Sequence, residues 1–350
     1  MIPFCYHIVT VFRAVNSISF CNSSIVGREL MPGIRDIAER AGVSISTVSN
    51  VLHHKNSASE ETREKIFAIA EELGYEIPSA KEKGVRTILF NLSDFDTLYY
   101  LDILHGISDY AYAKGYSFLI STGENFPHFS DPEKVCGCIA NDVNTTSAML
   151  KKIADKGIPM IVLDRELEHP RIKSIVVNNY AAEKQLVEGL IGAGYKKFAF
   201  LGGLDTADTK ERFAAFRDAL KENGLIFSRN DYYEGDWREK SGAQAARLLM
   251  LSEEMPEVLI CANDMMAIGA IRKFQEDGLR IPEDIAVTGF DDVIISRYTE
   301  LTTVAVPDYE RGFLAAQALI DILEGRGDFE TVRIGARVKW RKSTKVFRKQ

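Results

Sequence analysis

Hydrophobic and polar positions near the N-terminus follow the period of an α-helix. Two short helices joined by a turn are expected over residues 34–52. Their apolar side chains face one another across the turn: Ile34, Ile37, Ala38 and Ala41 on the first helix, Val48 and Val51 on the second. Gly42 can take the left-handed conformation that ends the first helix, and Ser44 is suited to cap the second. A third helix should begin after Ser59, its N-cap, and continue to Leu73.

From Thr87 onward the pattern changes to short apolar runs separated by amphipathic helical stretches. The apolar runs cover residues 88–92, 117–120, 158–163, 197–201, 258–261 and 285–288, and the helical stretches include 101–114, 181–193 and 211–222. Strands that alternate with helices in this way form parallel sheets covered by helices. The segment is too long for one small sheet. We therefore expect two doubly wound α/β lobes with a cleft between them, preceded by the small all-α domain.

The exposed face of the second N-terminal helix is suited to reading DNA. It carries small side chains and no acidic group, so the helix can enter a major groove and approach base edges and phosphates. We expect base contacts from Ile45, Ser46 and Asn50. Phosphate contacts are expected from the polar residues around them: Ser44, Thr47, Ser49, His53, Ser59 and Thr62. An ordinary helical hairpin is the simpler alternative, but it does not require this spacing.

These N-terminal residues resemble a known family. Three stretches are similar to the headpiece of the lactose-repressor and galactose-repressor (LacI/GalR) family: residues 41–44, 46–49 and 62–65. The resemblance implies a helix-turn-helix DNA-binding headpiece at residues 31–78, a hinge at 79–86 and an effector-binding core at 87–350. That core should resemble periplasmic binding proteins, with a first lobe at about 87–176 and 305–325 and a second at about 177–304 and 326–345. It also implies a homodimer that binds double-stranded operator DNA.

The chain departs from the family pattern in two places. The family hinge is longer and inserts a leucine into the minor groove, whereas this one is short and has no leucine, which counts against such a wedge. Between Ser121 and Cys136 the family has a full helix, but Pro127 and Pro132 interrupt the helical pattern here. We therefore expect the first lobe to lack part of one helix.

The charge of the headpiece limits non-specific binding to DNA. Residues 31–78 carry five cations against eight anions, and the whole chain has a net charge of -7. Non-specific attraction grows with the number of phosphates neutralised. Affinity would then come from dimerisation, from helix ends and from the basic hinge residues Lys81, Lys83 and Arg86.

Composition excludes several other classes of protein. No stretch of about 18 apolar residues is free of charged or strongly polar residues, so no membrane span is expected. The five cysteines form no disulfide framework, so reduced thiols in the cytoplasm are expected. Gly202-Gly203 lacks the third glycine of a dinucleotide site, and the six histidines show no metal spacing. We expect no cofactor, no metal and no enzymatic activity.

Residues 1–30 do not fit the rest of the chain. They are largely apolar and rich in serine but have no basic segment at the start, so a secretory signal is a poor match. We expect Met31 to be the native start. A peptide from residues 5–25 in the mass spectrum of the native protein would contradict this.

Polar side chains follow several of the apolar runs, at the strand ends where ligands bind in open parallel sheets. Carboxylates and amides match the hydroxyls of a sugar, and aromatic rings supply apolar faces for its ring carbons. Our candidates for effector binding include residues that also match the family's effector-contacting positions. They are Tyr99, Tyr100, Asn141, Asp164, Asp208, Arg212, Trp237, Asn263 and Asp291.

Several of these residues have a simpler alternative role. Asp264 and Asp292, beside two candidates, could cap the following helices, and Arg212 could be a plain ion-pair partner. Either Tyr99 or Tyr100 could belong to the core. Related cores of the family bind purines, nucleosides or phosphoprotein partners, so a sugar is one of several possible effectors.

Together these patterns predict a sequence-specific transcriptional regulator, acting as a repressor, in which a small ligand in the cleft controls DNA binding allosterically. The alternative is a sugar-binding protein or sugar-processing enzyme whose headpiece is vestigial. A gel-shift titration against the upstream region of the gene separates the two, because only the regulator protects a palindromic site.

Overall fold

The computed structural model describes residues 33–52, 58–73, 85–327 and 329–345. The chain divides into two compact units, Met1–Lys83 and Gly84–Gln350. The expected N-terminal extension at 1–30, His53 and the hinge residues Lys81 and Lys83 lie outside the described residues. Arg86, which we placed in the hinge, packs on the second unit, where it pairs with Glu324 at 3.5 Å.

The first unit is a three-helix domain built as the sequence predicts. Its helices are α1 (Ile34–Ala41), α2 (Ile45–Leu52) and α3 (Glu60–Glu72). Gly42 has a φ of 69° and ends α1, Ser44 Oγ accepts a hydrogen bond from Thr47 N at 3.0 Å, and Ser59 Oγ accepts one from Thr62 N at 3.4 Å. One apolar cluster joins the three helices: Ile37, Ala38, Ala41, Val48, Val51, Ile66 and Ala70.

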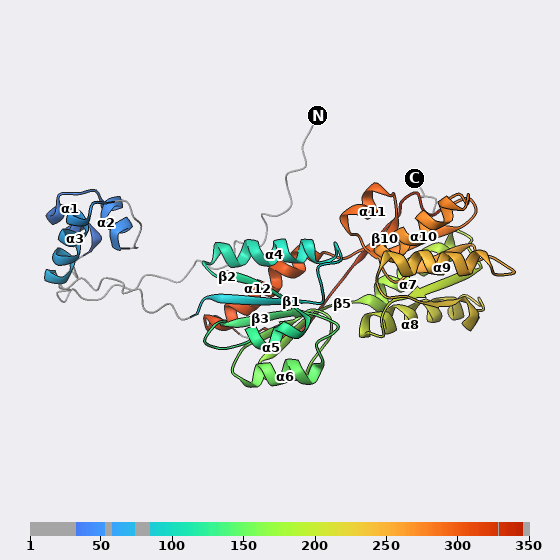
Figure 1. The fold of residues 1–350 in the computed structure, drawn as a ribbon, viewed down its shortest axis with the longest axis horizontal. Coiled ribbons are helices and arrows are strands. Elements are labelled where there is room, and N and C mark those ends of the chain that lie inside the picture. Colours follow the sequence, from blue (N-terminus) through green and yellow to red (C-terminus); the bar gives the residue numbers. More distant parts are fainter. Residues whose placement is uncertain (1–32, 53–57, 74–84, 328, 346–350) are drawn as a thin grey trace, which may run out of the picture. The chain divides into compact units, whose positions relative to one another are not determined.

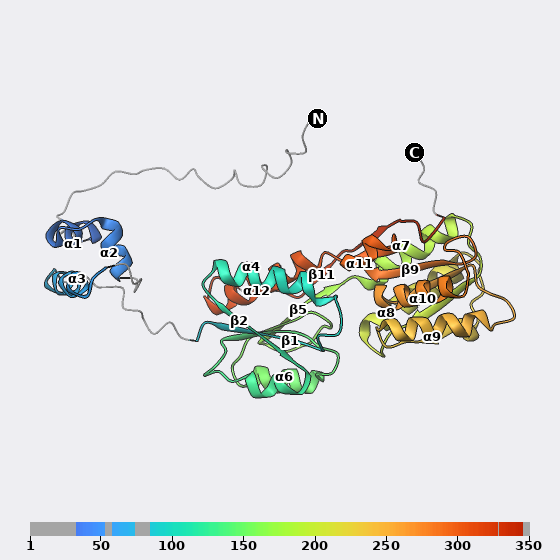
Figure 2. The same ribbon diagram turned by 45° about the horizontal axis from the view of Figure 1, so that its top comes forward.

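The second unit contains two six-stranded sheets, each with helices on both faces (Figure 1). The first sheet has the order β11-β5-β4-β3-β1-β2, and all of its strands are parallel. The strands are β1 (Thr87–Leu92), β2 (Ser117–Thr122), β3 (Gly137–Asn141), β4 (Met160–Val162), β5 (Ile172–Val177) and β11 (Val332–Ile334). In Figures 1 and 2, α4 (Tyr100–Ala113) and α12 (Asp308–Leu323) cover one face, and α6 (Ser147–Asp155) lies on the other.

The second sheet repeats this topology in the order β12-β10-β9-β8-β6-β7, with β12 antiparallel to β10. Its strands are β6 (Phe198–Gly202), β7 (Tyr232–Glu234), β8 (Val258–Cys261), β9 (Ala286–Asp291), β10 (Thr302–Ala305) and β12 (Arg337–Lys339). The helices around it are α7 (Asn179–Gly192), α8 (Ala207–Glu222), α9 (Glu239–Met250), α10 (Asp264–Glu276) and the short α11 (Ile294–Tyr298). The predicted fold class is therefore confirmed.

One expected lobe boundary is wrong. We placed residues from about 326 onward in the second lobe, but β11 at Val332–Ile334 pairs with β5 and extends the first sheet. The chain then reaches the second sheet at β12. The first lobe therefore includes a segment that we had assigned to the second lobe. Three-residue edge strands carry too short a pattern to be recognised in the sequence.

The truncated helix in the first lobe is confirmed. Between β2 and β3 the chain forms only a 3-10 turn, Gly123–Asn125, and the four-residue α5, Phe126–Phe129. Pro127 lies in the first turn of α5, where a missing N–H costs nothing, and Phe126 anchors the segment in the core. This short connection still covers its side of the sheet.

Candidate functional site

The candidate DNA-reading surface lies on α2 and on the start of α3. Ile45 is half exposed, although it is an isoleucine, and Ser44 and Ser46 are exposed beside it. Ser44 Oγ lies 2.7 Å from both Ser46 Oγ and Thr47 Oγ1, so these hydroxyls orient one another. Ser59 and Thr62 form the cap of α3. The side chains of Ser49 and Asn50, and all of His53, lie outside the described part of the headpiece.

A cavity of about 790 Å³ opens between the two lobes of the core, within the size range of small-molecule sites. All nine residues expected to bind effector line this cavity: Tyr99, Tyr100, Asn141, Asp164, Asp208, Arg212, Trp237, Asn263 and Asp291. They converge because the carboxyl ends of both sheets face it. Asn141, Asp164 and Asp291 lie at the ends of β3, β4 and β9 or within two residues of them.

Arg212 on α8 is held firmly at the cavity wall. Its Nε donates to Asn179 Oδ1 at 2.9 Å, its Nη1 donates to the carbonyl of Ala262, and its guanidinium lies 3.5 Å from the centre of the Phe290 ring. Nη2 is 3.8 Å from Asp291 Oδ1. The arginine is therefore more than an ion-pair partner, because stacking on Phe290 and two hydrogen bonds also fix its plane where it lines the cavity.

Trp237 offers its ring to the cavity from a strained turn. Its φ is 68°, a conformation that disfavours a side chain, and its carbonyl accepts a hydrogen bond from Asn263 Nδ2 at 3.0 Å. The ring lies against Gly203, where a Cβ would be 2.5 Å from the ring atom Cη2. Gly203 is thus required for the ring to approach the backbone.

Two of the cavity carboxylates are poised to accept hydrogen bonds. Asp164 Oδ1 is buried without a hydrogen-bond partner, while Oδ2 accepts from Arg165 Nη2 at 2.5 Å. Asp291 has a φ of 109° at the end of β9. Burial raises the pKa of both carboxyls above the ordinary range, and nearby arginines partly oppose the shift. Ligand hydroxyls would supply the donors that these oxygens lack.

The two adjacent tyrosines play different parts. Tyr100 is buried in the core of the first lobe and its hydroxyl accepts from Ser93 N at 3.4 Å. Tyr99 is only partly buried, and Asn141 Nδ2 donates to its hydroxyl at 3.3 Å. Both line the cavity, and their rings meet edge to face at 5.0 Å. Burial raises the pKa of Tyr100 to about 12, so its hydroxyl stays neutral.

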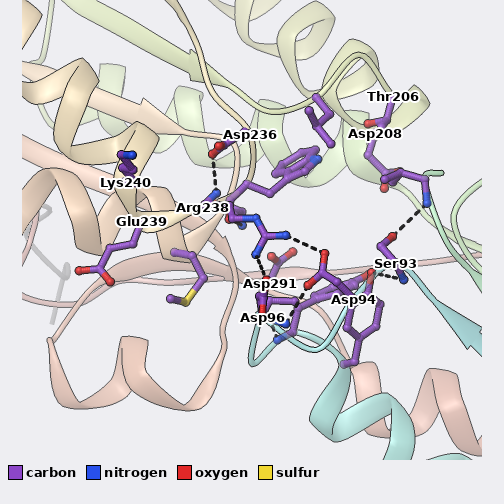
Figure 3. Close-up of a pocket in the computed structure, with 18 of the residues that line it drawn as sticks. Ser93, Asp94, Asp96, Thr206, Asp208, Asp236, Arg238, Glu239, Lys240 and Asp291 are labelled. Atoms are coloured by element: carbon purple, nitrogen blue, oxygen red, sulfur yellow. Dashed lines mark hydrogen bonds and ion pairs between the residues drawn. The ribbon is translucent and has the colours of Figure 1, made fainter. Parts of the chain in front are cut away.

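The sequence did not predict the cavity rim. Arg238, after β7, reaches across to the loop after β1, where its Nη2 lies 2.8 Å from Asp94 and its Nη1 lies 3.2 Å from Asp96 (Figure 3). Other lining residues that we did not single out come from this loop, from the segment after β3 and from the second lobe: Ser93, Thr97, Val143, Asn144, Leu204, Asp236, Glu239, Lys240, Ala243, Gln244, Arg247, Met265 and Arg272. Ser93 directly follows β1 and could have been found at that strand end, whereas most of the others lie within loops or along helices.

The capping alternatives for Asp264 and Asp292 are wrong. Asn263 is the N-cap of α10 and accepts from Met266 N at 3.0 Å. Asp264 instead accepts from Val293 N at 2.9 Å and from Thr303 Oγ1 at 2.5 Å, which fixes the turn after β9. Asp292 pairs with Arg341 at 2.5 Å. Both carboxylates therefore support the cavity wall from behind.

Two other features are absent from the described residues. No cluster of His, Cys, Asp and Glu suited to a metal ion occurs among them. No helix among them is long and apolar enough to cross a bilayer.

Both parts of the chain match known families of proteins. Residues 33–78 match bacterial regulatory proteins of the lacI family, and residues 187–344 match the periplasmic binding protein-like domain. The transcriptional repressor PurR of Aliivibrio salmonicida is 30% identical over 85% of this chain and 93% of its own length. PurR of Haemophilus influenzae is 29% identical over 90% of this chain and 99% of its own length.

Solved structures agree with this placement. The lac repressor dimer bound to operator and the anti-inducer ONPF is 27% identical, with a TM-score of 0.68 over 89% of this chain and 98% of its own. The complex of the transcriptional regulator CelR with cellobiose is 25% identical, with a TM-score of 0.67 over 89% of this chain and 100% of its own.

A helix-turn-helix domain joined to a two-lobed binding core defines a ligand-responsive DNA-binding regulator. The chain belongs to the LacI family of bacterial transcriptional regulators and is not an enzyme. Its partners are therefore operator DNA and a small effector.

Proposed function

We propose that this protein is a homodimeric repressor whose cavity binds a neutral, polyhydroxylated ligand, a sugar or a sugar derivative. The observation that carries the proposal is the convergence of all nine predicted residues on one cavity. Repression is the activity named for the PurR relatives. The CelR structure holds a disaccharide in a related fold, which supports a carbohydrate ligand here.

Charge balance in the cavity favours an uncharged ligand. Seven acidic residues and five basic residues line it. Most of the arginines already face carboxylates: Arg238 pairs with Asp94 and Asp96, Arg272 lies 2.5 Å from Glu239, and Arg212 lies near Asp291. A charged ligand would compete with these pairs, whereas hydroxyl groups can donate to the carboxylates and accept from the guanidinium groups.

On DNA, α2 would serve as the recognition helix. Ile45, Ser46 and Asn50 would lie over base edges. The remaining candidates would position the helix on phosphates: Ser44, Thr47, Ser49, His53, Ser59 and Thr62. Exposure of Ile45 supports this assignment, because an apolar side chain in solvent is suited to contact a thymine methyl group.

Thermal-shift screening of the full chain tests the ligand class. Hexoses, pentoses and disaccharides should include at least one compound that raises the melting temperature in a concentration-dependent way, since only the folded state has the cavity. Nucleosides and purine bases form the comparison panel. Stabilisation by the comparison panel alone would overturn the sugar assignment while leaving the regulator intact.

A further inference from the structure

A buried ion pair lies behind the cavity, and the sequence analysis did not predict it. Asp308 and Arg311 stand on the first turn of α12, and Arg311 Nη2 lies 3.0 Å from Asp308 Oδ1. Their side chains are 7% and 2% exposed. A buried pair of this kind seldom stabilises a fold more than apolar residues of the same size would. Its presence in a helix that otherwise packs through apolar residues points to another role.

Arg311 also forms a hydrogen bond with Tyr99, which lines the cavity. Its Nη2 donates to Tyr99 Oη at 2.6 Å, and its guanidinium lies 5.7 Å from the centre of the Tyr99 ring. Tyr99 follows β1, so this contact joins residues that are 212 positions apart in the chain. Asn141 Nδ2, from the end of β3, donates to the same hydroxyl at 3.3 Å.

These contacts leave the proton of the Tyr99 hydroxyl without a hydrogen-bond acceptor. A phenol oxygen has one proton to donate and can accept about two hydrogen bonds. Both neighbours are N–H donors, because a guanidinium has no acceptor and the Asn141 contact is made through its amide nitrogen. No residue of the described core accepts a hydrogen bond from Tyr99 Oη in return. Burial raises the pKa of Tyr99, so the proton is retained at neutral pH.

We propose that Arg311 is a positioning residue that makes the Tyr99 hydroxyl an obligate hydrogen-bond donor to the effector, so that the effector carries an acceptor oxygen at this point. The inference rests on the proposed function, since it assumes that the cavity is the effector site. It adds a rule of specificity. The carboxylates Asp164 and Asp291 select ligand donors, whereas Tyr99 rejects a group that can only donate, such as an ammonium.

The first test needs no ligand. The full chain is labelled with carbon-13 at Cζ of tyrosine, and the Tyr99 resonance is assigned by its loss in Tyr99→Phe. The double variant Asp308→Asn/Arg311→Met removes both buried charges together, so that neither is left unpaired. Lys273→Met/Asp277→Asn is the control, because it removes another partly buried pair, at the end of α10 in the second lobe, and neither residue lines the cavity.

The Tyr99 resonance should shift in the Asp308/Arg311 variant and stay in place in the control. An unchanged resonance in the Asp308/Arg311 variant, with its fold intact by circular dichroism, would overturn the proposal. Because this readout reports the contact itself, it decides the role of Arg311 even if no sugar binds.

The second test measures specificity with cellobiose, D-glucose and D-ribose as probes. Each hydroxyl of the tightest-binding sugar is replaced in turn by an ammonium group. At one position the wild type should reject the amino sugar by more than about tenfold, since two donors would face each other. Tyr99→Phe and the Asp308/Arg311 variant should lose this rejection, and the control should keep it.

The specificity rule would be overturned if the wild type, Tyr99→Phe and the Asp308/Arg311 variant rejected the amino sugars equally at every position. Failure of all three sugars to raise the melting temperature would instead count against the proposed ligand class. In that case the tyrosine resonance still decides whether Arg311 positions Tyr99.

Discussion

At the scale of single residues, Arg212 should separate effector response from DNA binding. Arg212→Ala removes the hydrogen bonds to Asn179 and Ala262 and the stacking on Phe290. It also removes the hydrogen bond that we propose between Arg212 and the effector; a charged hydrogen bond contributes about 1.5–3 kcal/mol, so effector affinity should fall by at least about tenfold. Operator affinity should be retained, because the headpiece is a separate unit.

Fluorescence anisotropy on operator DNA, with and without effector, measures both properties. Arg217→Ala is the control, since this arginine is exposed on the same helix and does not line the cavity. Loss of operator binding in a folded Arg212→Ala protein would contradict the separation.

Glu183 makes stability depend on pH. Its carboxyl is buried on α7, neither oxygen has a hydrogen-bond partner, and burial raises its pKa to about 8 while Arg212 partly opposes the shift. The unfolded chain has the ordinary value of 4.5. The stability contribution of Glu183 is therefore fully present below pH 4.5 and is lost as pH rises to about 8.

Urea denaturation between pH 5 and pH 9 should show this loss in the wild type and a flatter profile in Glu183→Gln. The difference in the free energy of unfolding between Glu183→Gln and the wild type should grow by up to about 1.4 kcal/mol per pH unit within this window. Glu188→Gln, exposed on the same helix, should keep the wild-type profile. Parallel profiles for Glu183→Gln and the wild type would show that Glu183 is not the cause.

At the scale of elements, α4 and α12 cross with their backbones in contact. A Cβ on Gly106 would lie 2.6 Å from Phe313 N, and a Cβ on Gly312 would lie 2.9 Å from the carbonyl carbon of Ile103. In the second lobe, Gly242 on α9 and Gly269 on α10 allow the backbones of these two helices to approach equally closely. Each lobe therefore depends on small residues where one helix pair meets.

Gly106→Ala should destabilise the first lobe by about 1–3 kcal/mol, because backbone atoms cannot move aside as a flexible side chain can. Gly192→Ala is the matched control, since no atom lies within 4 Å of the added carbon at the end of α7. The control should be neutral or slightly more stable. Chemical denaturation compares them, and equal stabilities would refute the close crossing.

The strands and helices also show which parts of the site could be predicted from the sequence. Apolar runs ending in Asp or Asn predicted the cavity, because parallel strands bring their carboxyl ends together. The same reasoning missed Arg238, which joins the site only through the placement of the lobes. It also missed Arg311: its spacing from Asp308 is that of an ordinary helical ion pair, and nothing in the sequence links it to Tyr99.

At the scale of the whole molecule, Arg238 holds the two lobes together across the cavity mouth. It lies between Asp94 and Asp96 of the first lobe and is partly exposed, so each pair should contribute about 1 kcal/mol or less. Arg238→Ala should therefore shift the lobes toward a more open state without unfolding them. Glu239, next in sequence, pairs with Arg272 within the second lobe, so Arg272→Ala is a suitable control.

Hydrogen exchange of the full chain follows this shift. Exchange in residues 93–98 should speed up in Arg238→Ala and remain unchanged in Arg272→Ala. Unchanged exchange in both variants would show that the pair does not restrain the lobes.

The central claim is that a ligand in the cavity changes the affinity of the headpiece for DNA. The most direct measurement is a titration of the full chain on the upstream region of its own gene, with and without the sugar found by thermal shift. We expect protection of a pseudo-palindromic site and a change of about 5- to 150-fold in affinity when the sugar is added. A site protected equally with and without a sugar that stabilises the protein would contradict the claim.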